Sequence, residues 1–123
     1  MVRLFALLVL TACVAVPPAP SAPGLYRLVS IDGTAFAARA TISFPAPGQF
    51  AGSAPCNSYS GEFTGPPPAL SAATLTSTEI ACDDLPDEAV FFAALSAMTL
   101  ADVSVTMVKL SNATGRSMVF VRP

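Results

Sequence analysis

The sequence predicts an α+β domain, a small, mostly antiparallel and partly barrel-like β-sheet with one packed α-helix at about residues 87–99. Short runs before residue 80 and after residue 100 are rich in strand formers, several with the alternation of half-buried strands. Between them the period becomes helical, with apolar side chains at i, i+3, i+4 and i+7: Phe91, Ala94, Leu95 and Met98. Strands, one helix and further strands favour a sheet that carries a single helix.

The strands before the helix are separated by turn residues. Residues 24–31 are rich in strand formers and end at the turn signal Asp32-Gly33. Residues 40–44 alternate cleanly, and the turn at 45–48 precedes an expected strand at 49–54. We expect a short strand at 59–63 and another within 70–80. Three prolines at 66–68 end the first of these, because proline cannot donate to a β-ladder.

The helix and a closing hairpin complete the predicted fold. Acidic residues crowd the start of the helix, where the helix dipole favours anions, and Pro86 suits the first turn. These acidic residues are Asp83, Asp84, Asp87 and Glu88. A strand is expected at 100–105. After it, Val108 and Leu110 should face Met118 and Phe120 across a turn at 112–115.

The N-terminal segment is typical of a secretory signal. Arg3 precedes the apolar run Leu4–Leu10, which is shorter than the roughly 20 residues needed to span a bilayer. The following Leu-Thr-Ala-Cys resembles the lipobox at which lipoprotein-processing enzymes attach diacylglycerol to cysteine. We expect residues 1–12 to be removed and Cys13 to carry the lipid. The alternative is an ordinary signal peptide cut near Ala12 or after Ala15, with Cys13 incidental.

A proline-rich linker follows at residues 13–23, before one domain at residues 24–123. The linker carries no charge, and ten extended residues at about 3.1 Å each would reach roughly 30 Å. Val14 rather than aspartate follows Cys13, which by analogy with other lipoproteins favours the outer membrane. We therefore expect a cell-envelope protein, lipid-anchored to the outer membrane and facing the periplasm.

Composition excludes several function classes. The chain has no histidine, Gly-rich phosphate loop or Cys-x-x-Cys pair. We therefore expect no enzyme activity, no catalytic residues, no metal and no cofactor. The predicted mature chain has five basic and eight acidic residues without a basic cluster, which argues against nucleic-acid binding and electrostatic lipid binding. Lipid on Cys13 is then the expected membrane attachment, and we expect a monomer.

Cys56 and Cys82 are the cysteines that remain once Cys13 carries lipid. In an oxidising compartment two such thiols usually pair, and closing their loop of about 26 residues adds about 3.5 kcal/mol in the chain-entropy model. Two buried free thiols are the alternative. A redox role is less favoured, because no positive charge lies near either cysteine in the sequence to lower its pKa.

Two segments around these cysteines resemble the signatures of a known family. Residues 52–63, GSAPCNSYSGEF, and residues 78–82, TEIAC, resemble the paired signatures of the META domain, the family of the heat-shock protein HslJ. Glu88 opens a helix that continues through Phe and Leu, as in that family. The resemblance covers nearly the whole domain. Departures are Tyr26, where the family commonly has Trp, and Pro55, where a Gly usually precedes Cys-Asn.

The resemblance implies a non-catalytic envelope lipoprotein that supports envelope integrity or stress and antibiotic tolerance. It would act through contacts with an envelope protein or the cell wall, and it brings no catalytic residues. The alternative is a small-ligand-binding or hydrolase-inhibitor lipoprotein. The polar segment after Cys56 is the expected contact loop, with Asn57, Ser58, Tyr59 and Gly61. We expect a structural role for Asn57, because asparagine bonds its own main chain in turns; binding is the rival role.

Overall fold

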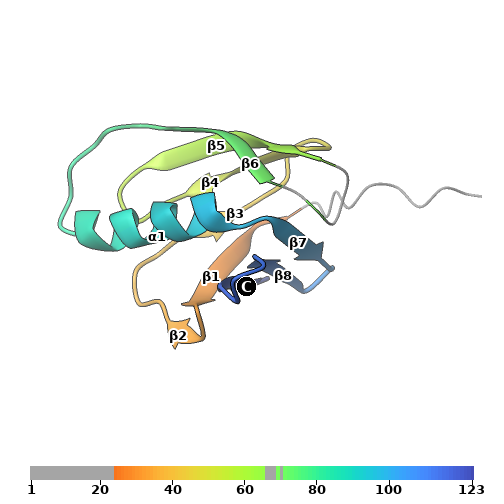
Figure 1. Ribbon diagram of the computed structural model, residues 1–123. Coiled ribbons are helices and arrows are strands. Elements are labelled where there is room, and N and C mark those ends of the chain that lie inside the picture. Colours follow the sequence, from red (N-terminus) through yellow and green to blue (C-terminus); the bar gives the residue numbers. More distant parts are fainter. Residues whose placement is uncertain (1–23, 66–68, 70) are drawn as a thin grey trace, which may run out of the picture.

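Two antiparallel sheets and one helix make up the part of the chain that the computed structural model describes, residues 24–65, 69 and 71–123 (Figure 1). The predicted signal segment, the predicted lipidation site Cys13 and the rest of the predicted linker lie outside the described residues, as do the three prolines at 66–68. The α+β class predicted from the sequence is confirmed: both sheets are antiparallel, and they are not closed into a complete barrel.

The larger sheet, sheet A, joins the beginning and the end of the domain. Its main path has the order β2-β1-β9-β8-β7, and β3 also pairs with β1. The strands are β1 (Tyr26–Ile31), β2 (Thr34–Ala35), β3 (Thr41–Ile42), β7 (Leu100–Val103), β8 (Met107–Ser111) and β9 (Ser117–Val121). Positive φ angles at both Asp32 and Gly33 are typical of the tight turn that connects β1 to β2.

The smaller sheet, sheet B, has the order β4-β5-β6. Its strands are β4 (Gln49–Ser53), β5 (Ser58–Thr64) and β6 (Ser71–Ser77). An isolated bridge between Ser43 and Ala51 links the end of β3 to β4, so the chain passes from one sheet into the other there. This link gives the described domain its partly barrel-like character.

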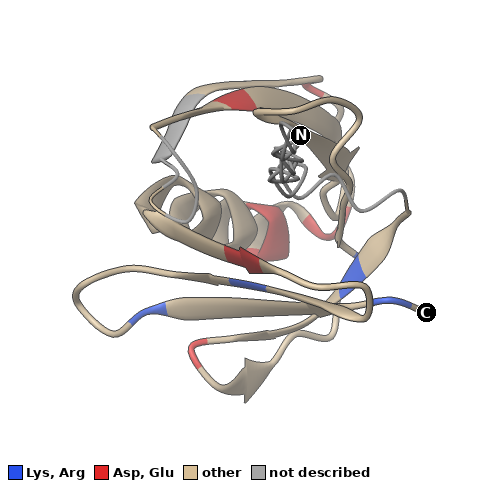
Figure 2. Ribbon diagram, turned by 90° about the vertical axis from the view of Figure 1, so that its right-hand side faces the viewer, with Lys and Arg blue, Asp and Glu red and all other residues tan. Residues whose placement is uncertain are grey.

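The helix α1 (Leu85–Ala97) lies between the two sheets (Figures 1 and 2). It begins two residues before the predicted start, with Pro86 in its first turn. It ends before Met98, whose backbone is already extended at ψ 135°. The four side chains that the sequence placed on the inner face are all buried: Phe91, Ala94, Leu95 and Met98.

The closing hairpin has the predicted register. Val108 pairs with Phe120 and Leu110 with Met118, and all four side chains are buried. Other strands differ from expectation in length. The strand predicted at 40–44 is only two residues long in β3, the strand predicted at 59–63 extends over seven residues in β5, and β2 was not predicted.

Tyr26, at the position where the family commonly has Trp, is a central core residue. It is fully buried, and its hydroxyl donates to the Ser104 carbonyl oxygen at 2.8 Å. This bond joins the start of β1 to the β7–β8 turn. We call this region of the domain the linker end; it comprises residues 24–27, 103–107 and 121–122. The opposite region, residues 54–58 and 78–88 around the start of α1, is the disulfide end (Figure 1).

Candidate functional site

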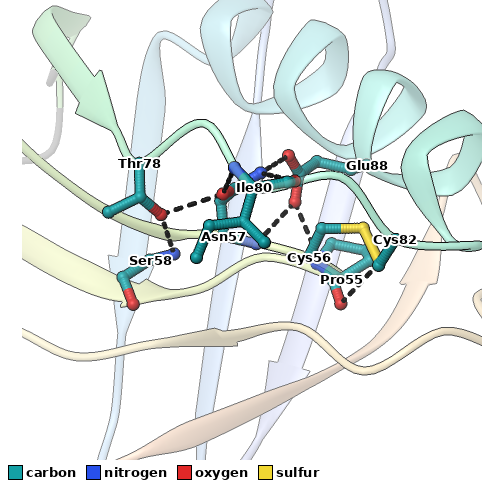
Figure 3. Close-up of a disulfide and its surroundings, with 8 residues drawn as sticks. All are labelled: Pro55, Cys56, Asn57, Ser58, Thr78, Ile80, Cys82 and Glu88. Atoms are coloured by element: carbon teal, nitrogen blue, oxygen red, sulfur yellow. Dashed lines mark hydrogen bonds between the residues drawn. A yellow bond between two sulfur atoms is a disulfide. The ribbon is translucent and has the colours of Figure 1, made fainter.

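A disulfide between Cys56 and Cys82 joins the turn before β5 to the loop before α1 (Figure 3). The Cα atoms are 5.7 Å apart, inside the range of about 7 Å that a disulfide requires. Cys82 Sγ also lies 3.9 Å from the Pro55 carbonyl oxygen, a contact without a hydrogen bond because a disulfide sulfur has no proton. The pair predicted from the cysteine count is therefore present.

Glu88 connects the same turn to the helix. Its Oε2 accepts the backbone N–H of Cys56 at 2.7 Å and that of Asn57 at 2.8 Å, and its Oε1 accepts the Asn57 side-chain amide at 2.5 Å. Only 6% of Glu88 is exposed. All three donors are neutral N–H groups, so hydrogen bonds rather than a cation compensate the burial of the carboxylate.

This role of Glu88 differs from the one expected from its sequence position. Because Glu88 lies near the start of α1, we expected it to interact with the helix dipole, as we expected for Asp83, Asp84 and Asp87. Those three are exposed, and Asp84 is the N-cap residue without a side-chain cap bond. Glu88 faces inward, and its partners lie 31 and 32 residues earlier in the chain. The signal in the sequence was the family resemblance at this position rather than its local spacing.

Asn57 uses every hydrogen-bonding position of its side chain. Oδ1 accepts the Ile80 N–H at 2.6 Å and the Thr78 hydroxyl at 2.9 Å, while Nδ2 donates to Glu88 and to the Ile80 carbonyl oxygen at 3.1 Å. An amide has two acceptor and two donor positions, so none is left for a ligand. The side chain thus pairs with Ile80 much as a backbone segment would, as Figure 3 shows.

Three residues of the expected contact loop, Ser58, Tyr59 and Gly61, lie in strand β5, and Asn57 directly precedes it. Tyr59 is buried, its hydroxyl donates to the Thr41 carbonyl oxygen at 2.5 Å, and burial raises its pKa. At Gly61 a Cβ would lie 2.0 Å from the Thr74 carbonyl oxygen, so glycine permits a close approach of strands. Of the four residues, only Ser58 is exposed.

An open groove of about 350 Å³ borders this buried cluster. Ile80 and Leu85 are 61% and 41% exposed beside it, and the acidic side chains of Asp83 and Asp84 are close in sequence. The groove is lined by Asn57, Ser77, Thr78, Glu79, Ile80, Ala81, Leu85, Glu88 and Phe92. Beside the disulfide, the described surface therefore offers apolar side chains on a backbone that Asn57 holds in place.

Within residues 24–65, 69 and 71–123, no group of three or more histidine, cysteine, aspartate or glutamate side chains is placed to hold a metal ion. In the same part of the chain, no helix has the length and apolar character needed to cross a membrane.

Comparison with known proteins agrees with the fold. An NMR structure of a protein from Burkholderia xenovorans is similar to this chain at 24% identity, covering 81% of each chain, with a TM-score of 0.63. A crystal structure of a DUF4847 family protein from Bacteroides vulgatus is similar at 13% identity, covering 85% of this chain and 95% of the other, with a TM-score of 0.66. None of the curated proteins matches the chain. The META domain model matches residues 21–123. The chain therefore belongs to the META domain family.

Proposed function

We propose that this chain is a non-catalytic, lipid-anchored envelope protein that contacts an envelope protein or the cell wall through the groove at the disulfide end. In this proposal the contact supports envelope integrity or tolerance of stress and antibiotics. The observation that carries it is the position of Ile80. Its side chain is 61% exposed, yet its backbone N–H and carbonyl are both bonded to Asn57. An exposed apolar side chain on a fixed backbone is suited to contact a partner at little entropic cost.

The chemistry of the buried cluster favours a structural role over a catalytic one. Both oxygens of Glu88 accept bonds from fixed N–H groups, and all four positions of Asn57 are filled. A general base must be able to reach a substrate proton, and Glu88 would have to leave these donors to do so. The cluster is therefore suited to hold the Cys56–Asn57 turn against α1.

Photo-crosslinking in cells tests the proposed contact. A photoreactive residue at position 80 should capture a defined envelope protein or peptidoglycan fragment, identified by mass spectrometry. Val105, 69% exposed at the linker end, is the matched control and should not capture the same product. Equal capture at both positions, or none at position 80, would argue against the groove as the contact surface.

The anchor has its own test. The anchor is inferred from the lipobox-like segment Leu10–Cys13. Replacing Cys13 with serine should therefore abolish lipid addition and release the protein from membranes. Intact mass and membrane fractionation measure the two effects. A Cys13→Ser protein that keeps its mass and remains firmly membrane-bound would rule out this anchor.

A small ligand is the second candidate for the groove, because about 350 Å³ falls within the range of roughly 300–1,000 Å³ typical of ligand sites. The hydrolase-inhibitor alternative lacks the rigid protruding loop that it would need at Cys56–Gly61, because β5 begins at Ser58. Native mass spectrometry of protein purified from membranes would reveal a retained small molecule. Loss of that molecule in an Ile80→Asp variant would place it in the groove.

A further inference from the structure

Three exposed apolar side chains gather at the linker end. Leu25, Val105 and Met107 are 50%, 69% and 40% exposed. Strand pairing and one further bond hold their segments together: Met107 pairs with Val121, and the Arg122 N–H donates to the Thr106 carbonyl oxygen at 2.9 Å. The β1 strand lies on the other side of β9, so the three side chains belong to adjacent segments of one sheet end.

Basic residues surround this apolar group. Arg27 pairs with Val121, the same residue that Met107 faces from the other side, so Arg27 and Met107 share the outer face of sheet A. Lys109 follows Met107 on this outer face, whereas Arg122 lies against the buried Tyr26, 5.3 Å from the centre of its ring. In Figure 2, blue segments that mark basic residues lie on strands of sheet A and beside the C terminus.

Folding, rather than the sequence order, creates this group of charges. Positions 27, 109 and 122 are far apart along the chain, so the sequence shows no basic cluster and predicted no electrostatic contact with lipid. Asp102 is the acidic residue on the same sheet face, directly opposite Lys109 in the β7–β8 pairing. On this face the two cations Arg27 and Lys109 therefore outnumber the acidic residue, and Arg122 adds a cation at the end of the sheet beside Tyr26.

The disulfide end has the opposite charge. Four exposed acidic side chains lie in the loop before α1 and in its first turn, at Glu79, Asp83, Asp84 and Asp87. Glu62 is also exposed, on the outer face of sheet B. An anionic surface would repel the disulfide end and attract the linker end, which would orient the domain.

The path of the chain indicates which surface the linker end meets. The described domain begins at Gly24, beside Leu25, and only ten residues separate Gly24 from Cys13. A lipid on Cys13 would therefore keep this end close to the bilayer. The tether gives the linker end a high effective concentration at the membrane surface. Even a small apolar and basic surface would then be in contact with the membrane for a substantial fraction of the time.

We propose that the linker end, with Leu25, Val105, Met107 and Arg27, docks on the anionic phospholipid surface that holds the lipid anchor. This inference rests on the anchor at Cys13 in the proposed function. Docking would hold the domain in one orientation, with its groove and acidic disulfide end directed away from the membrane.

Tryptophan fluorescence tests the docking, because the chain contains no tryptophan of its own. Full-length lipidated protein with Val105→Trp is placed in vesicles of phosphatidylethanolamine and phosphatidylglycerol whose acyl chains carry bromine, a contact quencher. The matched control is Ile80→Trp, at a similarly exposed apolar position of the disulfide end. Quenching should be several times stronger at position 105 than at position 80.

Flotation and intact mass separate the possible failures. Protein that is lipidated and floats with vesicles, yet is quenched equally at both positions, would overturn the docking and leave the anchor intact. Protein without lipid that does not float would overturn the anchor and the docking together. A concentration-dependent blue shift of Val105→Trp in detergent, without quenching in vesicles, would assign the patch to a second copy of the chain instead.

The charge contribution has a separate readout. Arg27 is exposed and forms no ion pair with another described residue, so Arg27→Gln should leave the fold unchanged. It should lower the quenching of Val105→Trp, and replacement of phosphatidylglycerol by phosphatidylcholine should have the same effect. If neither Arg27→Gln nor the change of lipid alters the quenching, charge does not contribute to the docking.

Discussion

Two carboxylates, Glu88 and Asp32, perform the same task at different depths in the molecule. Each accepts hydrogen bonds from a backbone N–H and from a side chain distant in sequence. Asp32 accepts the Ser117 N–H at 3.1 Å and two N–H groups of Arg116, at 3.0 and 3.2 Å. Glu88 is 6% exposed, whereas the side chains of Asp32 and Arg116 are 42% and 38% exposed.

The difference in depth determines what each carboxylate contributes. Water can replace the carboxylate at Ser117 and Arg116, so loss of Asp32 leaves no polar group without a partner. Water has little access to the N–H of Asn57, because that residue is 5% exposed. Loss of Glu88 would therefore leave buried donors unsatisfied, and such groups cost much more than an exposed ion pair contributes.

The disulfide should contribute most to stability. Replacing both Cys56 and Cys82 with serine should lower the free energy of unfolding by about 3.5 kcal/mol, because it opens a loop with a sequence separation of 26. Urea unfolding measures the loss, and reductant should lower wild-type stability similarly. Reductant should leave the double variant unchanged. Alkylation of unfolded, unreduced protein should label neither cysteine, and two labels per molecule would contradict the pairing.

Glu88 should come next. Glu88→Ala should destabilise the domain by about 3 kcal/mol, because it removes the acceptor of the Cys56 and Asn57 backbone N–H groups. Asp87→Ala is the matched control in the same helical turn; it should cost only about 0.5 kcal/mol through the helix dipole. Equal effects would mean that burial does not distinguish the two carboxylates. Glu88→Gln should also destabilise, because one amide end would present N–H to the N–H donors.

Asn57 should have a smaller effect. A single lost turn bond would cost roughly 1 kcal/mol, but the observed side chain makes four bonds, so we expect about 2 kcal/mol for Asn57→Ala. In a double-mutant cycle with Glu88→Ala the two losses should be less than additive, since the residues share a bond. An unchanged melting temperature with loss of a crosslinked partner would instead favour a binding role.

The sequence predicted features that depend on local pattern. The period of Phe91, Ala94 and Leu95 placed the inner face of α1, and alternation around a short turn placed the register of β8 and β9. It did not predict that Glu88 faces inward or that Asn57 is buried. Both features depend on the contact between α1 and the Cys56–Asn57 turn, which lies about 31 residues before Glu88 in the sequence. The local spacing of apolar and polar residues does not predict such a contact.

Asp32→Asn should give the smallest effect, and its pH dependence would sharpen the comparison with Glu88. The side-chain bond to Arg116 and then the bond from the Ser117 backbone hold the pKa of Asp32 below its ordinary value of 3.8. Because the pKa is lower in the folded state, the stabilisation is complete above the unfolded pKa. It is lost as the pH falls through the folded pKa. The wild type should therefore melt at a slightly higher temperature than Asp32→Asn at neutral pH, and the two melting temperatures should converge in acid.

Asparagine tolerates the positive φ of 52° at this position, so the turn itself is retained in Asp32→Asn. A difference that persists at about pH 2 would assign the effect to backbone conformation instead of charge. A difference in melting temperature that persists at neutral pH in high salt would argue against a contribution from an exposed ion pair.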